Sequence, residues 1–281
     1  MLPHLVYHVG VTTIRRGVFA LLSCLTCVSL RSALEAEPLA PKPATVVLIS
    51  LAPSPYTQRH DALRAGIGVL LFLRKISGAE RLPIKGEFYD ASTYYDDAAR
   101  LRPILHRGDV VLVGGSTWAQ GSSYLARKFF ETVGGETLLG VSASAWATAG
   151  GEHTGGEIVV QDMLRSLMGM GAQVFTLGQK LPVFTTEERQ GTPPGHFTLL
   201  DCWYMDQFAR TISVVALARG DPELAKQIAA KLSYSPTYYN HMPAADEELK
   251  SRFEQVQILL NDAAKPKSDA YRRLRELITS P

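Results

Sequence analysis

Apolar runs alternate with amphipathic segments over residues 44–219 of this chain. Five short runs have the length and composition of strands, and they cover residues 45–51, 86–90, 109–113, 138–142 and 173–177. The first is a continuous β-branched and apolar stretch, which is typical of a strand buried on both faces. Between the runs, apolar residues recur at helical spacing, as Leu63, Ile67 and Leu70 do. The pattern therefore predicts strands and helices in alternation.

This alternation favours a parallel α/β sheet. Five strands within about 175 residues match the flavodoxin-like architecture, a three-layer fold whose five-stranded parallel sheet has the order 2-1-3-4-5. Right-handed crossovers then bring the loops after strands one, three and four to one edge of the sheet. Those loops begin near Leu51, Gly114 and Ala143. Because ligands of open parallel sheets bind at the carboxyl ends of the strands, we expect the functional site there.

Residues 1–43 differ from the rest of the chain. No acidic residue precedes Glu35, and Arg15 and Arg16 stand directly before an apolar run at 17–30. A basic region followed by an apolar one is typical of a secretory or transit signal, with an unstructured extension as the alternative. The run is shorter than the about 20 residues of a membrane-spanning helix. We expect residues 1–43 to be a targeting segment, which directs the protein to an organelle or a membrane surface, followed by a linker. If the segment does not target the protein, we expect a cytoplasmic location.

Residues 221–281 predict a helical C-terminal extension of a domain at 44–220. Asp221 followed by Pro222 predicts a helix start. Apolar residues at 249, 253, 256 and 260 then mark an amphipathic helix, and a basic helix ends the chain. The pattern leaves two roles open for this extension: it packs back on the domain or it serves a partner subunit.

Composition excludes several classes of function. The formal net charge is +2, so we expect no nucleic-acid partner. Three cysteines cannot form a disulfide framework. Cys24 and Cys27 have C-x-x-C spacing, but they lie within an apolar run without a second pair or a nearby histidine. We interpret them as small apolar residues, and we expect no metal site.

Three segments carry a family resemblance. Residues 116–121 read Ser-Thr-Trp-Ala-Gln-Gly, residues 151–157 read Gly-Glu-His-Thr-Gly-Gly-Glu, and residues 191–198 read Gly-Thr-Pro-Pro-Gly-His-Phe-Thr. In this order they resemble Pro-Thr-Arg-Phe-Gly-Asn, Ser-Gln-His-Gly-Gly-Gln-Glu and Gly-Ser-Pro-Tyr-Gly-Ala of the NAD(P)H:quinone oxidoreductases of the tryptophan-repressor-binding-protein type. Those are FMN proteins of flavodoxin-like fold. Thr117 and His153 match the family, whereas Trp118 stands in place of Arg and Ala119 in place of Phe. The resemblance spans residues 46–219.

The resemblance implies two walls of a flavin pocket. The shelf for the isoalloxazine ring would consist of Ser116, Thr117, Trp118, Ala119 and Gln120, with backbone N–H groups facing the polar edge of the ring. Trp118 would stack on the ring, because a large aromatic face packs well against a flat cofactor. The second wall would be residues 142–148, with Ser142, Ser144 and Trp146. There, Trp146 would close over the ring or a bound quinone. For Trp118, a place in the core at the strand end is the alternative.

The first loop departs from the flavodoxin-like pattern. Such proteins hold the FMN phosphate in a Gly- and Ser/Thr-rich loop at a helix N-terminus, where N–H groups and the helix dipole favour an anion. Residues 50–59 contain no glycine, and two prolines remove two N–H donors. The remaining candidates for the phosphate are Ser50, Ser54, Thr57 as N-cap, and Arg59 as the charge. The alternative is a rigid turn that binds nothing.

His153 is the candidate catalytic residue. In a flavoenzyme the cofactor carries the hydride chemistry and the protein supplies position and electrostatics. A histidine beside the ring can hydrogen-bond the oxygen of an acceptor quinone, or stabilise charge that develops there. A histidine just before a helix can also be a simple surface residue. Thr154 and Glu157 have the spacing of a capping box, so we expect Glu157 to cap that helix.

The sequence predicts an FMN-dependent quinone reductase with NAD(P)H as donor and two-electron, ping-pong kinetics, the substrates being implied by the resemblance. We also expect a homo-oligomer, and contact with a membrane through the N-terminal segment. One alternative is a flavodoxin-like scaffold that has lost its flavin and acts through protein contacts. A one-electron carrier is a third reading, but such carriers dock through strongly acidic surfaces, which a chain of net charge +2 does not favour.

Overall fold

The computed structural model describes residues 42–51, 61–94, 97–117, 121–135, 137–151, 154–177, 181–186, 193, 195–232, 247–265 and 267–279. The chain divides into two units, Met1–Lys42 and Pro43–Pro281. The predicted targeting segment, with Cys24 and Cys27, lies outside the described residues. No helix among the described residues has the length and apolar character needed to span a membrane.

A parallel sheet forms the centre of the second unit. Its strands are β1 (Ala44–Ser50), β2 (Ile84–Asp90), β3 (Val110–Ser116), β4 (Ser142–Ala149), β5 (Gln173–Val174) and β6 (Val183–Thr185). The order is β2-β1-β3-β4-β5, every pair is parallel, and β6 also pairs with β4. This is the flavodoxin-like order, so the predicted fold is confirmed.

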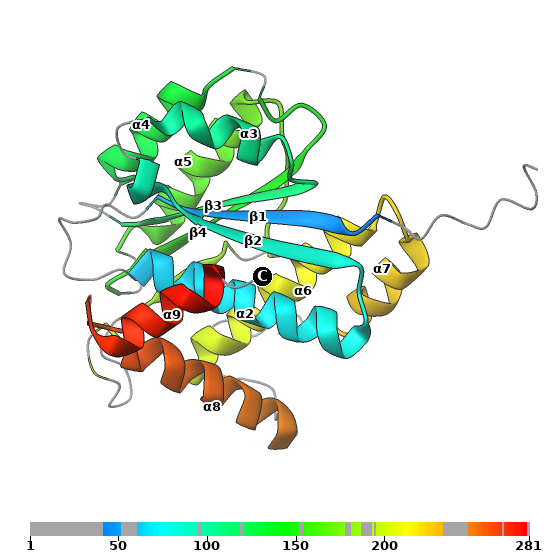
Figure 1. Cartoon of the computed structure of the whole chain (residues 1–281), viewed down its shortest axis with the longest axis vertical. Helices are drawn as coiled ribbons and strands as arrows, with labels where there is room; N and C mark the ends of the chain where they lie inside the picture. Colours follow the sequence, from blue (N-terminus) through cyan, green and yellow to red (C-terminus); the bar gives the residue numbers. More distant parts are fainter. Residues whose placement is uncertain are drawn as a thin grey trace, which may run out of the picture. The chain divides into compact units, whose positions relative to one another are not determined.

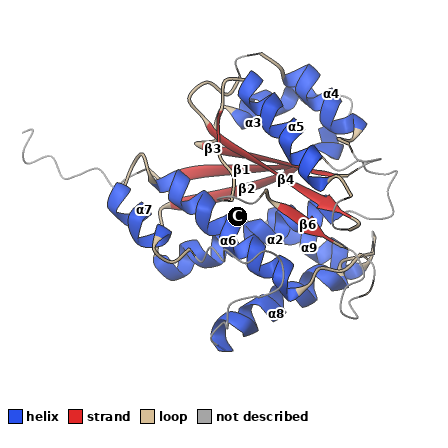
Figure 2. Cartoon of the chain, turned by 180° about the vertical axis from the view of Figure 1, so that it is seen from behind, coloured by secondary structure: helices blue, strands red, loops and turns tan. Residues whose placement is uncertain are grey.

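Helices cover both faces of the sheet (Figures 1 and 2). One face carries α3 (Arg102–Leu105), α4 (Tyr124–Val133) and α5 (Gly156–Gly169). The other carries α2 (Asp61–Glu80) and α6 (Leu199–Leu217). The short 3₁₀ helices η1 (Ala91–Tyr94) and η2 (Ala98–Leu101) connect β2 to α3. A sheet between two helical layers is the expected three-layer arrangement.

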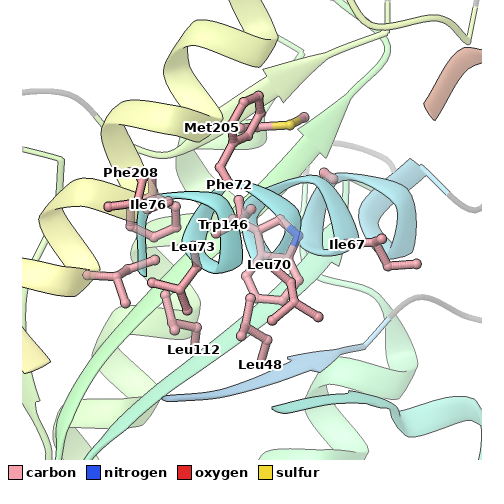
Figure 3. Close-up of a cluster of buried hydrophobic side chains, with 14 of the residues drawn as sticks. Leu48, Ile67, Leu70, Phe72, Leu73, Ile76, Leu112, Trp146, Met205 and Phe208 are labelled. Carbon is pink, nitrogen blue, oxygen red and sulfur yellow. The ribbon is translucent and has the colours of Figure 1, made fainter. Parts of the chain in front are cut away.

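Alternating residues of each strand serve the two layers. Leu48 of β1 and Leu112 of β3 face α2, whereas their neighbours Val47 and Val111 pack in the core beneath α4 and α5. Figure 3 shows Leu48 and Leu112 pointing toward α2, with Phe208 of α6 on its other side. All five side chains are fully buried, which explains why these strands read as continuous apolar runs.

The fourth strand lies further along the chain than the sequence pattern predicted. We expected it at 138–142 with a loop from Ala143, but residues 137–140 form a turn and β4 begins at Ser142. The apolar residues at 138–142 are misleading because Leu138 fills the core from that turn. The fifth strand is also different. It stops at Val174, and β6 continues the pairing with β4 nine residues later, as a strand beyond the five that we expected.

The C-terminal extension packs back on the domain. Its helices are α7 (Pro222–Ala229), α8 (Glu247–Asp262) and α9 (Asp269–Thr279). Asp221 caps α7 as expected, accepting a hydrogen bond from Leu224 N. Phe253, Val256 and Leu260 of α8 are buried in the same core as α2 and α6. Figure 1 shows α8 on the side of α2 that faces away from the sheet. The extension is therefore a further helical layer over α2.

Candidate functional site

The strands β1, β3, β4 and β6 end at one side of the sheet, which we call the carboxyl edge. In the register of the sheet, Ser50 lies beside Gly114, and Ser116 lies beside Thr148. Thr148 in turn pairs with Phe184 of β6. The strand order reverses between β1 and β3, and that switch point is where ligands of such sheets bind. Small and hydroxyl-bearing side chains therefore gather at the position where a ligand is expected.

Hydrogen bonds tie the ends of β3 and β4 together. The backbone N–H of Thr117 donates to the carbonyl of Thr148 at 2.9 Å, and the Thr117 hydroxyl donates to the same oxygen at 3.1 Å. The Thr148 hydroxyl lies 3.3 Å from the Ser116 hydroxyl. Thr117 N–H is thus used by the sheet, which corrects the expectation that it faces the polar edge of a ring. Ser116 and Thr117 still lie at the expected place.

The start of α4 is fixed beneath the same edge. Ser123 is its N-cap, and its hydroxyl accepts a hydrogen bond from Ala126 N at 3.2 Å and lies 3.4 Å from the carbonyl of Leu51. Both Ser123 and Ser50 are buried. Ser123 connects the end of β1 to the first turn of α4. A serine just before a helical pattern is a recognisable N-cap signal, which the sequence analysis did not use.

A glycine turn joins β4 to α5. Thr154 donates its hydroxyl to Gly151 O at 2.7 Å and accepts from Gly151 N at 3.2 Å. The N-cap of α5 is Gly155, with φ of 93° and no capping side chain. The expected capping box of Thr154 and Glu157 is therefore wrong, since Thr154 closes the turn before the helix. Gly150 is exposed, and a Cβ there would meet nothing within 4 Å, so this turn leaves open space at the edge.

Three residues predicted to line the flavin do not do so, because β4 begins at Ser142. Ser142 pairs with Val110 at the amino end of the strand, far from the carboxyl edge. Ser144 is buried and donates its hydroxyl to Phe175 O at 2.7 Å. Trp146 is fully buried among α2 residues, and its indole N–H donates to Ala62 O at 3.0 Å. Trp146 is therefore a core residue, and the expectation that it closes over a ring or a quinone is wrong.

The other predicted site residues lie outside the described residues. They are Ser54, Thr57 and Arg59 of the first loop, Trp118, Ala119 and Gln120 of the third, and His153 of the fourth. Of the predicted set, the structure brings Ser50, Ser116 and Thr117 together at the ends of neighbouring strands.

The carboxyl edge also contains a buried charge network that sequence reasoning missed. Asp61, in the first turn of α2, accepts from Arg64 at 2.5 Å and from the Thr186 hydroxyl at 3.1 Å. Arg64 is fully buried and also donates to Gly195 O at 2.5 Å and Leu260 O at 2.9 Å. The i,i+3 spacing of Asp61 and Arg64 was the available signal.

His196 lies next to Gly195, in the segment that precedes α6. Burial lowers the pKa of His196 below its ordinary value, and the Arg64 guanidinium lowers it further, whereas Asp262 opposes this. The segment joins the edge because Gly195 N donates to Thr186 O at 2.8 Å, and Thr186 N donates to Ala149 O at 3.0 Å. A titratable side chain of the kind used in acid–base chemistry therefore belongs to the carboxyl edge.

The residues at the place expected for the ring end of a flavin are small or carry hydroxyls. They are Ser116, Thr117, Thr148 and Gly150. The phosphate end would fall to Ser54, Thr57 and Arg59, outside the described residues. Among the residues that the structure describes, no group of three or more His, Cys, Asp and Glu could hold a metal ion.

Comparison with known proteins gives structural likeness without sequence likeness. No protein-family model matches the chain, and no curated protein matches it. An oxidoreductase from Corynebacterium diphtheriae is 15% identical with a TM-score of 0.49, over 63% of this chain and 98% of that one. A WrbA-like flavodoxin from Agrobacterium tumefaciens is 12% identical, with a TM-score of 0.45 over 62% and 97%. An NADH:FMN oxidoreductase in its apo form is 16% identical, with a TM-score of 0.42 over 69% and 92%. The assignment of the flavodoxin-like fold therefore rests on the strand order.

Proposed function

We propose that this chain is an FMN-dependent flavoprotein of the NAD(P)H:quinone oxidoreductase kind. The observation that carries the proposal is the grouping of Ser50, Ser116 and Thr117 at the switch point, beside the open turn at Gly150. That position is where an open parallel sheet binds its ligand. The sequence resemblance of residues 116–121 and 151–157 adds the type of cofactor and the substrates.

The residues of the site then have separate roles. Ser116 and Thr117 would hold the ring end of FMN, which when bound supplies hydride transfer between a nicotinamide and a quinone. Thr148 and Ser123 keep the ends of β3 and β1 in place through the hydrogen bonds described above. His153 would donate a hydrogen bond to the acceptor oxygen and so stabilise the charge that develops there.

A second candidate is a flavodoxin-like scaffold that binds no flavin. The observation in its favour is Asp61, whose buried carboxylate lies in the first described turn of α2. A helix start that binds a phosphate needs positive potential, and a carboxylate there opposes it. Arg64 does not supply a charge for phosphate, because its guanidinium is bound to Asp61, Gly195 and Leu260. Flavin binding would then depend on residues 52–60.

Separate half-reactions test the proposal. The protein loaded with FMN is reduced anaerobically by NAD(P)H and then mixed with a quinone, and each step is followed by flavin absorbance. We expect His153→Ala to slow reoxidation by quinone by about a hundredfold, the usual scale of general acid catalysis, and reduction by NAD(P)H by less than about threefold. Equal effects on the two half-reactions would remove the acceptor-side role of His153. A loaded protein that NAD(P)H does not reduce would contradict the enzyme proposal.

A further inference from the structure

The C-terminal end of α8 holds the segment that precedes α6. Asn261 binds both backbone polar groups of Phe197: its Oδ1 accepts from Phe197 N at 2.8 Å, and its Nδ2 donates to Phe197 O at 3.0 Å. Gln257, one turn earlier, donates to the same carbonyl at 3.2 Å. An amide that pairs with both groups of one residue fixes the backbone there much as a neighbouring strand would. Phe197 and Asn261 are 64 positions apart, so the segment depends on a helix that comes much later in the chain.

Arg64 of α2 completes this attachment from the other side. Its guanidinium donates to Gly195 O and to Leu260 O, and it lies 4.9 Å from the centre of the Phe197 ring. Leu260 is in the last turn of α8, where carbonyls lack helical partners and the helix dipole favours a cation. Arg64 therefore joins the end of α8 to the same segment that Asn261 holds.

These contacts immobilise His196 from both sides. Its preceding residue is held by Arg64 through Gly195 O and by Thr186 through Gly195 N, and its following residue is held by Asn261. Arg64 and Phe197 are fully buried, so these contacts are shielded from water. Hydrogen bonds to a charged group are stronger in such a water-free environment. His196 itself is only partly buried, so its side chain is not closed off from solvent.

We propose that Asn261 and Arg64 are positioning residues that present His196 at the carboxyl edge, where its ring donates a hydrogen bond to the second oxygen of the quinone-type acceptor, the first being bound by His153. This inference rests on the proposed function and deepens it, since it adds the segment before α6 and the C-terminal extension to the acceptor side. The lowered pKa of His196 fits this role, because the neutral ring carries one N–H donor at neutral pH. Arg64 and Asp262 are the charged groups that act on His196, with opposite effects.

The test compares Asn261→Ala, Asn261→Asp and His196→Ala with Arg219→Ala in the full-length protein. Arg219 donates to Gly140 O and Gln173 Oε1 at the amino end of the sheet, so it controls for the loss of a comparable contact far from the edge. Three quantities are measured: hydrogen exchange of the Phe197 amide, the FMN dissociation constant, and KM for the quinone. The exchange reading needs no cofactor.

We expect Asn261→Ala to speed exchange of the Phe197 amide and to raise the quinone KM, each by about tenfold, with the FMN dissociation constant unchanged. Asn261→Asp keeps the acceptor for Phe197 N–H but turns a carboxylate oxygen toward Phe197 O in place of the amide donor, so it should recover only part of the protection. Because Asn261 acts through His196, the Asn261→Ala/His196→Ala double variant should match His196→Ala alone. Arg219→Ala should change none of the three quantities.

Exchange of the Phe197 amide that Asn261→Ala leaves unchanged would overturn the inference without affecting the proposed function. Effects of Asn261→Ala and His196→Ala on KM that multiply would do the same. A KM that rises equally in Arg219→Ala would also overturn it, since the effect would then be one of general stability. A wild-type protein that binds no FMN and reduces no quinone would overturn the proposed function and the acceptor role of His196. The exchange reading would then still decide whether Asn261 positions the segment.

Discussion

Trp146 of β4 lies directly beside Gly114 of β3 in the sheet, and its indole occupies the space that a side chain at position 114 would need. A Cβ on Gly114 would come within 1.8 Å of Trp146 Cε2, and one on Gly66 of α2 within 2.4 Å of Cζ2. The two glycines therefore form the slot in which the indole lies between the sheet and α2. Figure 3 shows Trp146 beneath α2 among the leucines of this core.

Gly114→Ala should destabilise the protein by about 1–3 kcal/mol, because the indole must shift in a close-packed core. Gly115→Ala is the matched control. Its Cβ would lie 3.7 Å from Met163 Sδ on the other face of the same strand, at ordinary contact distance, so we expect a change within about 0.5 kcal/mol. Urea unfolding measures both. Equal losses for the two variants would show that the indole does not fill this slot.

Trp146→Phe separates a core role from a cofactor role. The substitution removes the hydrogen bond to Ala62 O and part of a fully buried side chain, which should cost about 1–3 kcal/mol. Because Trp146 does not line the carboxyl edge, the FMN dissociation constant at a temperature well below unfolding should stay within about twofold. A large loss of FMN affinity with little loss of stability would restore the flavin-wall interpretation.

How far the sequence predicted the fold can be judged from β1, α2 and β4. The first strand and the helix that contains Leu63, Ile67 and Leu70 were found from local pattern, because the apolar period of each element matches its own geometry. β4 was misplaced since Ala-Ser-Ala-Trp-Ala-Thr-Ala has weak strand propensity, and the strand forms there through pairing with β3 on one side and β5 and β6 on the other.

The candidate site was predictable only where it depends on strand ends. Ser50, Ser116 and Thr117 follow from the rule that ligands bind at the switch point. The contacts of Arg64 with Gly195 and Leu260 join residues 131 and 196 positions apart, so no local spacing reveals them. The contacts of α8 with the segment before α6 could not be predicted for the same reason, although the buried face of α8 was predicted from its apolar period.

The Asp61–Arg64 pair should contribute strongly to stability as long as both partners are present. Arg64→Met leaves the Asp61 carboxylate in a buried site without its cation, which should cost about 3–5 kcal/mol. Lys226→Ala, which breaks the exposed Lys226–Glu223 pair at the same i,i+3 spacing, should have no measurable effect. Thermal or urea unfolding distinguishes them. Comparable effects of the two substitutions would mean that burial of the Asp61–Arg64 pair has no energetic consequence.

His196 predicts a dependence of stability on pH. Because folding lowers the pKa of His196, the unfolded chain binds more protons than the folded one as the pH falls through the ordinary histidine range. Stability should therefore be full above the unfolded pKa and should decline on acidification from about pH 6.5 downward. His196→Gln should flatten this part of the profile. A profile that His196→Gln leaves unchanged would contradict the prediction.

The central claim is that the carboxyl edge binds FMN, and a fluorescence titration of the full-length protein with FMN tests it most directly. We predict saturable quenching with one FMN per chain. Thr117→Pro, which removes the N–H and hydroxyl bonds to Thr148 O, should weaken binding by at least about tenfold. Thr137→Ala, which removes a hydroxyl contact after α4, should leave it unchanged. FMN fluorescence that stays constant at every protein concentration would contradict the account and favour the flavin-free scaffold.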